Sequence, residues 1–178
     1  MIYFISDTHF NHNNIITLAN RPFKDVEEMN ETIVENWNRV VKDEDIVYFL
    51  GDFCFEEKDK DTNYWLNRLK GKIIFIRGNH DHTKMVKLTK AVLASNLGGL
   101  LLLHDPFGLD YSGVLIHGHH HANGKLFDVF RRRICVSCEL IDYTPISLDD
   151  LMTMYKYLKA NYKKQSKENK RYGQPPKQ

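Results

Sequence analysis

The sequence predicts an α/β domain whose β-sheets are covered by helices. Short runs of β-branched and large apolar residues recur along the chain, and segments with apolar residues at helical spacing stand between them. The chain has 178 residues, of which 42% are hydrophobic and 27% charged, so it can bury one sizeable core and is short for two ordinary domains. We therefore expect one domain over residues 1–162, followed by a tail over residues 163–178.

Six segments have the composition of β-strands: Ile2–Ser6, Ile46–Leu50, Ile73–Arg77, Leu100–Leu103, Val114–His117 and Ile134–Cys138. Helices are expected between and after them. Asp25 with Glu28 forms a start that resembles a capping box, and apolar residues recur at helical spacing from there through Val40. A shorter helix is expected over Thr62–Leu69, and the last begins at Ser147.

The end of the chain differs from the rest. Residues 163–178 read KKQSKENKRYGQPPKQ, which has almost no side chain able to anchor it in a core, so we expect a basic, flexible tail. Such a tail aids solubility; weak contact with a phosphate backbone is the alternative. No apolar run approaches membrane-spanning length, MIYFISDTHF is not a cationic leader, and three cysteines do not suggest a secreted disulfide framework. These features predict a cytoplasmic protein without a membrane partner.

Polar side chains follow five of the predicted strands, each time where the strand ends. They are Asp7 and His9 in SDTH, Asp52 in GD, Asn79, His80 and Asp81 in GNHD, His104 after LLL, and His119 and His121 in HGHHH. Ligand sites in open α/β sheets form where strands exit, so we expect these side chains to meet. Carboxylate and amide oxygens together with imidazole nitrogens suit Mn²⁺, Fe, Zn²⁺, Ni²⁺ or Co²⁺ better than Ca²⁺.

The spacing of these residues supports a shared site. Asp7 and His9 are two residues apart, as are His119 and His121, so an extended backbone would turn both members of each pair to one face. Glycines adjoin several of the polar residues, as expected where the backbone turns sharply or approaches a ligand closely; they are Gly51, Gly78 and Gly118.

The series D-x-H, G-D, G-N-H-D, H and G-H-x-H resembles the motif blocks of the calcineurin-like metallophosphoesterase superfamily. All five blocks stand in order between Asp7 and His121, and YTPISLDDL resembles the end of small members, so the resemblance reaches about Leu151. It implies two packed β-sheets flanked by helices, an αββα sandwich, with two divalent metal ions, Mn²⁺ favoured. It also implies the ligands: Asp7, His9 and His121 for the first ion, Asn79, His104 and His119 for the second, and Asp52 as the bridge.

The resemblance further implies a phosphoesterase in which a water or hydroxide that bridges the metals attacks the ester directly. His80 would assist the leaving group, with Asn79 and His80 beside the substrate. Arg21 and His12 follow the first ligands and are candidates to bind phosphate oxygens, with surface packing as an equal alternative. Asp81 is expected either to orient His80 or to act as a turn or cap residue.

Small phosphodiesters are the favoured substrates. The chain has no room for a separate cap domain, and a diester carries one charge, whereas a monoester dianion needs further cations, for which Arg21 is the evident candidate. A phosphomonoesterase or a nuclease with the same centre is the alternative, although nucleic acid is not favoured because the chain offers little beyond its basic tail. A protein-binding scaffold, like a retromer subunit of this fold, is less favoured because all seven ligand positions hold competent residues. The sequence leaves the oligomeric state open.

Several residues stand outside the motif blocks. His120 is expected to point away from the metals, and His117 to orient a ligand or a water. Cys135 and Cys138 have zinc-type spacing, but they lie three apart in a strand pattern with no second pair, which favours core or half-buried thiols. The run Arg131–Arg133 is typical of a solvated face or a hairpin, and near the site it would attract anionic substrates.

Overall fold

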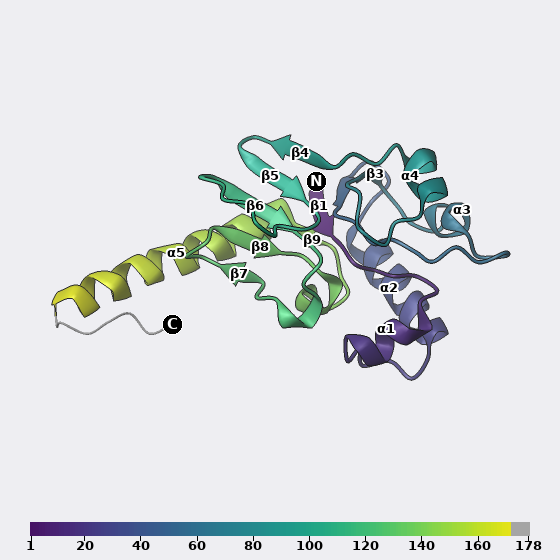
Figure 1. Cartoon of the computed structure of the whole chain (residues 1–178), viewed down its shortest axis with the longest axis horizontal. Helices are drawn as coiled ribbons and strands as arrows, with labels where there is room; N and C mark the ends of the chain where they lie inside the picture. Colours follow the sequence, from purple (N-terminus) through teal and green to yellow (C-terminus); the bar gives the residue numbers. More distant parts are fainter. Residues whose placement is uncertain (172–178) are drawn as a thin grey trace.

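Strands and helices alternate along residues 1–171, the part of the chain that the computed structural model describes (Figure 1). The strands are β1 (Ile2–Ile5), β2 (Ile46–Phe49), β3 (Lys72–Phe75), β4 (Ala94–Leu97), β5 (Leu100–Leu103), β6 (Val114–His117), β7 (Phe127–Asp128), β8 (Arg133–Cys135) and β9 (Ile146–Ser147). The α-helices are α1 (Asn13–Leu18), α2 (Val26–Val40), α3 (Thr62–Leu66), α4 (Thr83–Thr89) and α5 (Leu148–Arg171), and two short 3₁₀ turns are η1 (His121–Asn123) and η2 (Cys138–Ile141).

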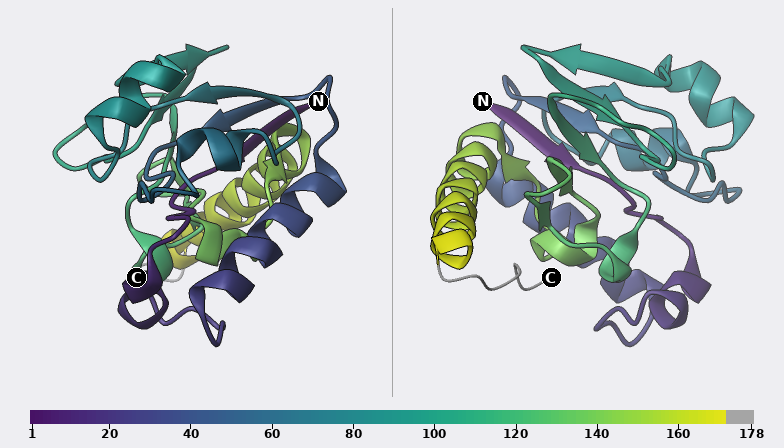
Figure 2. Two further views of the ribbon diagram at one scale, coloured as in Figure 1. Left: turned by 90° about the vertical axis from the view of Figure 1, so that its right-hand side faces the viewer. Right: turned by 60° about the vertical axis from the view of Figure 1, so that its left-hand side comes forward.

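The strands form two mixed sheets flanked by helices, which confirms the predicted fold class (Figure 2). In the first sheet, of order β3-β2-β1-β9, three parallel strands have antiparallel β9 at one edge. In the second, of order β4-β5-β6-β8-β7, β5, β6 and β8 are parallel and the two edge strands are antiparallel.

The two sheets are joined where β1 and β8 end. The Ser6 backbone N–H donates to the Val136 carbonyl at 3.0 Å, and the Cys138 N–H donates to the Ser6 carbonyl at 3.1 Å. Because parallel strands on both sides run toward this junction, their carboxyl ends lie at one place. The fold thereby gathers segments that are far apart in the sequence.

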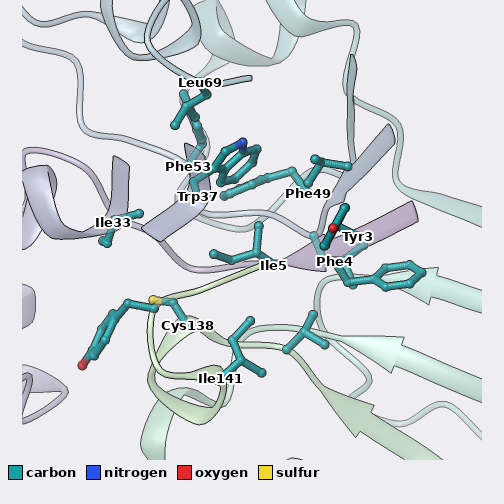
Figure 3. Close-up of a cluster of buried hydrophobic side chains, with 14 of the residues drawn as sticks. Tyr3, Phe4, Ile5, Ile33, Trp37, Phe49, Phe53, Leu69, Cys138 and Ile141 are labelled. Carbon is teal, nitrogen blue, oxygen red and sulfur yellow. The ribbon is translucent and has the colours of Figure 1, made fainter. Parts of the chain in front are cut away.

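The core lies on both sides of β1. Figure 3 shows Trp37 and Phe49 on one side of Ile5, and Cys138 and Ile141 on the other. Trp37, from α2, is fully buried, and its indole N–H donates to the Lys70 carbonyl at 2.9 Å. Burial of one such large side chain contributes roughly 2–3 kcal/mol, so α2 is firmly held on the first sheet.

Helix α2 begins as the sequence predicts. The Asp25 carboxylate accepts a hydrogen bond from the Glu28 N–H at 2.8 Å, which satisfies one of the free donors of the first turn. At the start of α5 the Asp150 N–H donates to the Ser147 hydroxyl at 3.1 Å, again at the expected cap. None of the helices formed within residues 1–171 combines the length and apolarity needed to cross a bilayer.

Helix α5 is longer than expected and projects from the body of the molecule (Figure 1). We predicted a flexible tail from residue 163, but the helical backbone continues through Arg171. The reason is that residues 163–171 are mostly Lys, Gln, Glu and Arg, which favour helix, and that Gly and Pro first appear beyond them. The rest of the predicted tail, residues 172–178, lies outside the described residues.

The remaining differences are short elements. Helices α1 and α4 and strands β4, β7 and β9 were not predicted, and α3 ends at Leu66 instead of Leu69. Strand β4 reads ASNL and β9 only IS, so neither carries a β-type apolar run. They form because a neighbouring strand offers an edge for pairing, a tertiary effect that local propensity does not record.

Candidate metal centre

Seven polar side chains meet where the parallel strands end. Each arrives on the segment that follows a strand, and the residues are Asp7 and His9 after β1, Asp52 after β2, Asn79 after β3, His104 after β5, and His119 and His121 after β6. They are the seven that the sequence assigned to metal binding, and the structure brings all of them together.

Asp7, His9 and His121 form the first cluster. One potential ligand atom from each lies within 4.8 Å of the others, and His121 Nε2 is 3.7 Å from Asp7 Oδ1. The His9 and His121 rings are stacked with their centroids 5.2 Å apart. Two imidazoles and one carboxylate thus face a common point.

Asn79, His104 and His119 form the second cluster. Asn79 Oδ1 lies 2.8 Å from His104 Nε2 and 3.0 Å from His119 Nδ1. Asp52 Oδ2 is 3.6 Å from His9 Nε2 and 3.4 Å from His104 Nε2, so this carboxylate lies between the clusters as a bridging ligand would.

The backbone that presents these residues is not extended. Asp7 and His9 have φ angles of 59° and 49°, and His119 and His121 have 73° and 47°, all in the left-handed region. The expectation that each pair shares a face of an extended strand is therefore wrong. The strands end earlier, and successive left-handed residues turn the side chains inward; such strained conformations concentrate at functional sites.

Two glycines are required by close contacts with carboxylates. A Cβ added at Gly78 would lie 2.2 Å from Asp52 Oδ1, and one added at Gly118 would lie 2.6 Å from Asp7 Oδ2. Any side chain at these positions would displace the carboxylates. This confirms the predicted close approach of backbone to the site.

In the centre, the negative charge of Asp52 is balanced by protonation of His104. Burial opposes the charge on Asp52, but the hydrogen bond and positive charge of His104 outweigh it and lower the pKa of Asp52 to about 2. Burial also opposes a charge on His104, but contacts with Asp52 and Asp7 raise the pKa of His104 to about 9. Burial lowers the pKa of His9 to about 2, so its ring is neutral and keeps a lone pair for a cation.

A buried ring nitrogen of the first cluster lacks a hydrogen-bond partner among the described residues. His9 Nε2 is buried, and no group within the described residues forms a hydrogen bond with it. An unsatisfied buried polar atom costs about 1–3 kcal/mol. A cation between His9 and Asp52 would remove that cost, so the residues present fit a metal site.

A family model for calcineurin-like phosphoesterases matches residues 1–137, a range that contains all seven side chains. The chain belongs to this family. Membership implies metal-dependent hydrolysis of phosphoesters. The superfamily resemblance predicted from the motif blocks is thereby confirmed.

Individual relatives agree with this assignment. The chain is 49% identical over 156 residues to an uncharacterized protein of Methanocaldococcus jannaschii, covering 83% of this chain and 87% of the relative. It is 26% identical over 178 residues to the gene 66 protein of Mycobacterium phage L5, covering 77% and 86%. The crystal structure of a protein of unknown function from Aquifex aeolicus superposes with a TM-score of 0.66 at 31% identity, covering 86% of this chain and 98% of the other.

Arg21 does not lie where a phosphate-binding residue would. Its guanidinium is fully buried and donates to the carbonyls of Asp7 (2.6 Å) and Thr8 (2.9 Å) and to the Glu139 carboxylate (2.8 Å). A guanidinium held in this way is not exposed to a substrate phosphate. We therefore correct the substrate-binding role of Arg21: it fixes the segment that carries the first ligands.

Glu139 was missed by the sequence reasoning. Its Oε1 accepts a hydrogen bond from His121 Nδ1 at 2.9 Å while it pairs with Arg21, so it turns His121 Nε2 toward the first cluster. A carboxylate behind a ligand histidine is a recurring feature of metal sites. A signal existed, because Glu139 follows β8 at the same sheet end as the other polar residues.

His80 and His12 lie on one side of the first cluster. The His80 side chain is exposed, with its ring centroid 5.7 Å from that of His9, and its backbone N–H donates to Asp52 Oδ1 at 2.8 Å. The His12 ring is half-buried and stacked on Phe55 at 4.0 Å. Both are near enough to the cluster for contact with a substrate, and their predicted roles stay predictions.

The Asp81 side chain forms hydrogen bonds with backbone groups. Its carboxylate accepts hydrogen bonds from the N–H groups of Gly78 (2.6 Å), Phe53 (2.9 Å) and Asp52 (3.2 Å). The structure thus favours the cap role over orientation of His80. These bonds tie the segments after β2 and β3 together beneath the bridging carboxylate.

His120 points away from the clusters, as predicted, and its ring packs edge-on against that of His117 at 5.1 Å. His117 Nδ1 bonds to the Gly118 carbonyl at 2.8 Å, and within residues 1–171 we find no hydrogen bond from its ring to a ligand side chain. Cys135 and Cys138 are buried free thiols, as expected. Burial raises the pKa of both, which leaves them protonated.

An open pocket of about 320 Å³ adjoins the second cluster. Asn79 and His104 line it together with Arg77, Leu103 and Asp105. Arg77 is exposed and lies between β3 and the candidate ligand Asn79. With Arg21 buried, Arg77 becomes the candidate cation for a substrate oxygen.

Proposed function

We propose that this protein is a metal-dependent phosphoric ester hydrolase that favours small phosphodiesters. The observation that carries the proposal is the convergence of two buried carboxylates, one amide and four imidazoles, with His9 Nε2 buried and unpaired among the described residues. Two divalent ions, Mn²⁺ favoured, would there activate water and stabilise charge on the phosphoryl oxygens.

The chain's own residues then have separate tasks. Asp52 bridges the two ligand sets, and Glu139 and Arg21 keep His121 and the segment of Asp7 in place. His80, exposed beside His9, donates a proton or hydrogen bond to the departing oxygen. Asn79 lies between its cluster and the open pocket, where it can contact a substrate oxygen.

The preference for a diester rests on the cations near the opening. Arg21 is buried and paired, which removes the residue that a monoester dianion would have used. Arg77 remains, and Asp105 lines the same pocket with the opposite charge, only 3.8 Å from His119 Nε2. The side chains of this pocket therefore offer little net positive charge to a monoester dianion. A monoanionic diester needs less positive charge for binding.

The test compares kcat/KM for bis-p-nitrophenyl phosphate and p-nitrophenyl phosphate at saturating Mn²⁺, in wild type and Arg77→Ala. We expect the diester to be preferred in both proteins, because Arg77 is not needed for a monoanion. A preference for the monoester in wild type that disappears in Arg77→Ala would overturn the diesterase assignment. Absence of metal-dependent turnover on either ester would overturn the hydrolase itself and favour a scaffold.

Two further predictions accompany this function. The three free, buried cysteines support a reducing compartment, in line with the predicted cytoplasmic location. The mixed nitrogen and oxygen ligand set supports Mn²⁺ or Fe over Ca²⁺. Metal analysis of the purified protein checks the second point.

A further inference from the structure

We propose that the outer face of the second sheet binds single-stranded nucleic acid in a basic groove that begins beside the metal centre. This proposal rests on the proposed function, because a bound strand is a phosphodiester and would be a substrate for the neighbouring metal centre. The binding can nevertheless be measured without hydrolysis. Its structural basis is a pair of adjoining pockets.

The first pocket, about 200 Å³, starts next to a metal-ligand position. Its lining includes His117 and His120, and the His120 ring centroid lies 5.8 Å from that of His119. Lys125, Arg131 and Arg133 supply three positive charges, and Asp128 one negative charge. Asp128 already pairs with Arg131 at 3.0 Å, so the pocket carries a net positive charge.

The second pocket, about 330 Å³, continues the first along the sheet. Both are lined by Arg131 and Arg133, so they adjoin at these two side chains, and together we call them the basic groove. The second adds Arg132, the negative charge of Asp110, Tyr111 and the ring of Phe130, which is 75% exposed, so its three arginines leave it with a net positive charge. A ring this exposed beside cations is accessible to a ligand.

The groove lies on the face of the sheet opposite the core. Ile116 of β6 and Ile134 of β8 are fully buried, and side chains alternate along strands. Leu115, His117 and Arg133 therefore point to the other face, where the groove runs.

This combination selects the ligand class. Cations spaced along a groove follow a phosphate backbone, and an exposed aromatic ring stacks on a base of any sequence. A double helix would hide its bases from Phe130. The run Arg131–Arg133, for which we expected a solvated face or a hairpin, lines these two pockets.

The experiment measures fluorescence anisotropy of a labelled oligothymidylate of about 12 nucleotides. The full-length protein is used both as purified and in EDTA. We expect saturable binding in both. The logarithm of the association constant should fall, for each tenfold rise in salt concentration, by about 0.7 per cation in contact with the strand.

Matched variants locate the site. Phe130→Ala should weaken binding about fivefold or more through lost stacking, while Phe107→Ala, which removes a ring 90% exposed outside both pockets, should not. Lys125→Ala should lower the salt dependence by about 0.7 units, while Lys24→Ala, before α2, should leave it unchanged.

Wild-type affinity in Phe130→Ala would overturn the proposal. Equally tight binding of poly-glutamate of the same length would also overturn it, because the groove would then bind any acidic polymer. Failure of the hydrolase assignment gives a different result: no turnover of bis-p-nitrophenyl phosphate, with strand binding in EDTA retained. The two failures are thus distinguishable.

Discussion

His80 is the exposed imidazole nearest to the first cluster, and its role depends on the leaving group. A proton donor matters most when the departing oxygen is basic. His80→Ala should therefore lower kcat by about 10²–10⁴-fold on a diester with an alkoxide leaving group and much less on an activated nitrophenyl ester. Metal content should barely change, since its ring is no predicted ligand. Equal losses on both substrates would contradict the assignment and indicate substrate binding.

Glu139 is a positioning residue that acts through His121. Glu139→Gln removes the charge that aligns His121 Nδ1, so metal affinity should fall about 10–100-fold, with activity recovered when Mn²⁺ is raised. The variant also leaves the buried Arg21 without its charged partner, so the protein should lose stability. Calorimetric titration with Mn²⁺ measures the affinity.

The control for Glu139 is Glu27→Gln, which removes an exposed partner of Lys60 on α2. Exposed pairs contribute little, so its metal affinity should equal that of wild type. If Glu139→Gln instead bound Mn²⁺ normally but stayed inactive at saturating metal, Glu139 would act in catalysis and the positioning role would be wrong.

At the scale of elements, short α3 supports the first ligand segment. Trp65 of α3 is fully buried, and its ring is stacked on Phe10 with the centroids 4.5 Å apart. Phe10 directly follows His9, and its backbone N–H donates to the Phe53 carbonyl at 3.0 Å. One indole thereby connects a peripheral helix to the segments that follow β1 and β2.

Trp65→Ala should destabilise the protein by about 3–5 kcal/mol, because it leaves a large cavity against Phe10. Trp65→Phe should cost less, since it fills part of the space and removes an indole N–H that has no hydrogen-bond partner among the described residues. Urea unfolding gives both values. Tyr157→Ala, at a side chain 68% exposed on α5, is the control that should change little; a similar loss there would contradict the local explanation.

For the whole molecule, the metal centre links stability to metal concentration. Six parallel strands from two sheets end at it, so cations bound there would connect segments across the fold. Metals that bind only the folded chain stabilise it by about 2.7 kcal/mol at a hundredfold excess over Kd. For a chain of this size that raises Tm by roughly 5–10 °C.

Thermal unfolding in EDTA and with added Mn²⁺ measures this shift. In Asp52→Asn most of the shift should disappear, because the carboxylate between the two clusters loses its charge. An equal Tm in EDTA and Mn²⁺ for the wild type would show that the centre does not bind the metal.

The sequence by itself determined the seven candidate ligands and the fold class. Each strand that precedes a candidate ligand is a local apolar run, and the polar residues follow closely, so chain direction alone predicts that Asp7, Asp52 and His104 reach the same sheet end. The capped start of α2 was equally local. Short-range patterns suffice where the functional residue is attached to the element that positions it.

Tertiary structure alone decided which side chains stand behind the ligands and which remain open. Arg21 and Glu139 are 118 residues apart, and their pairing depends on how the two sheets join. The same packing buries Arg21, exposes Arg77 beside His104 and places Phe130 along a basic groove. These outcomes follow from long-range contacts, because the burial of a charged residue depends on partners that its neighbours in the chain do not specify.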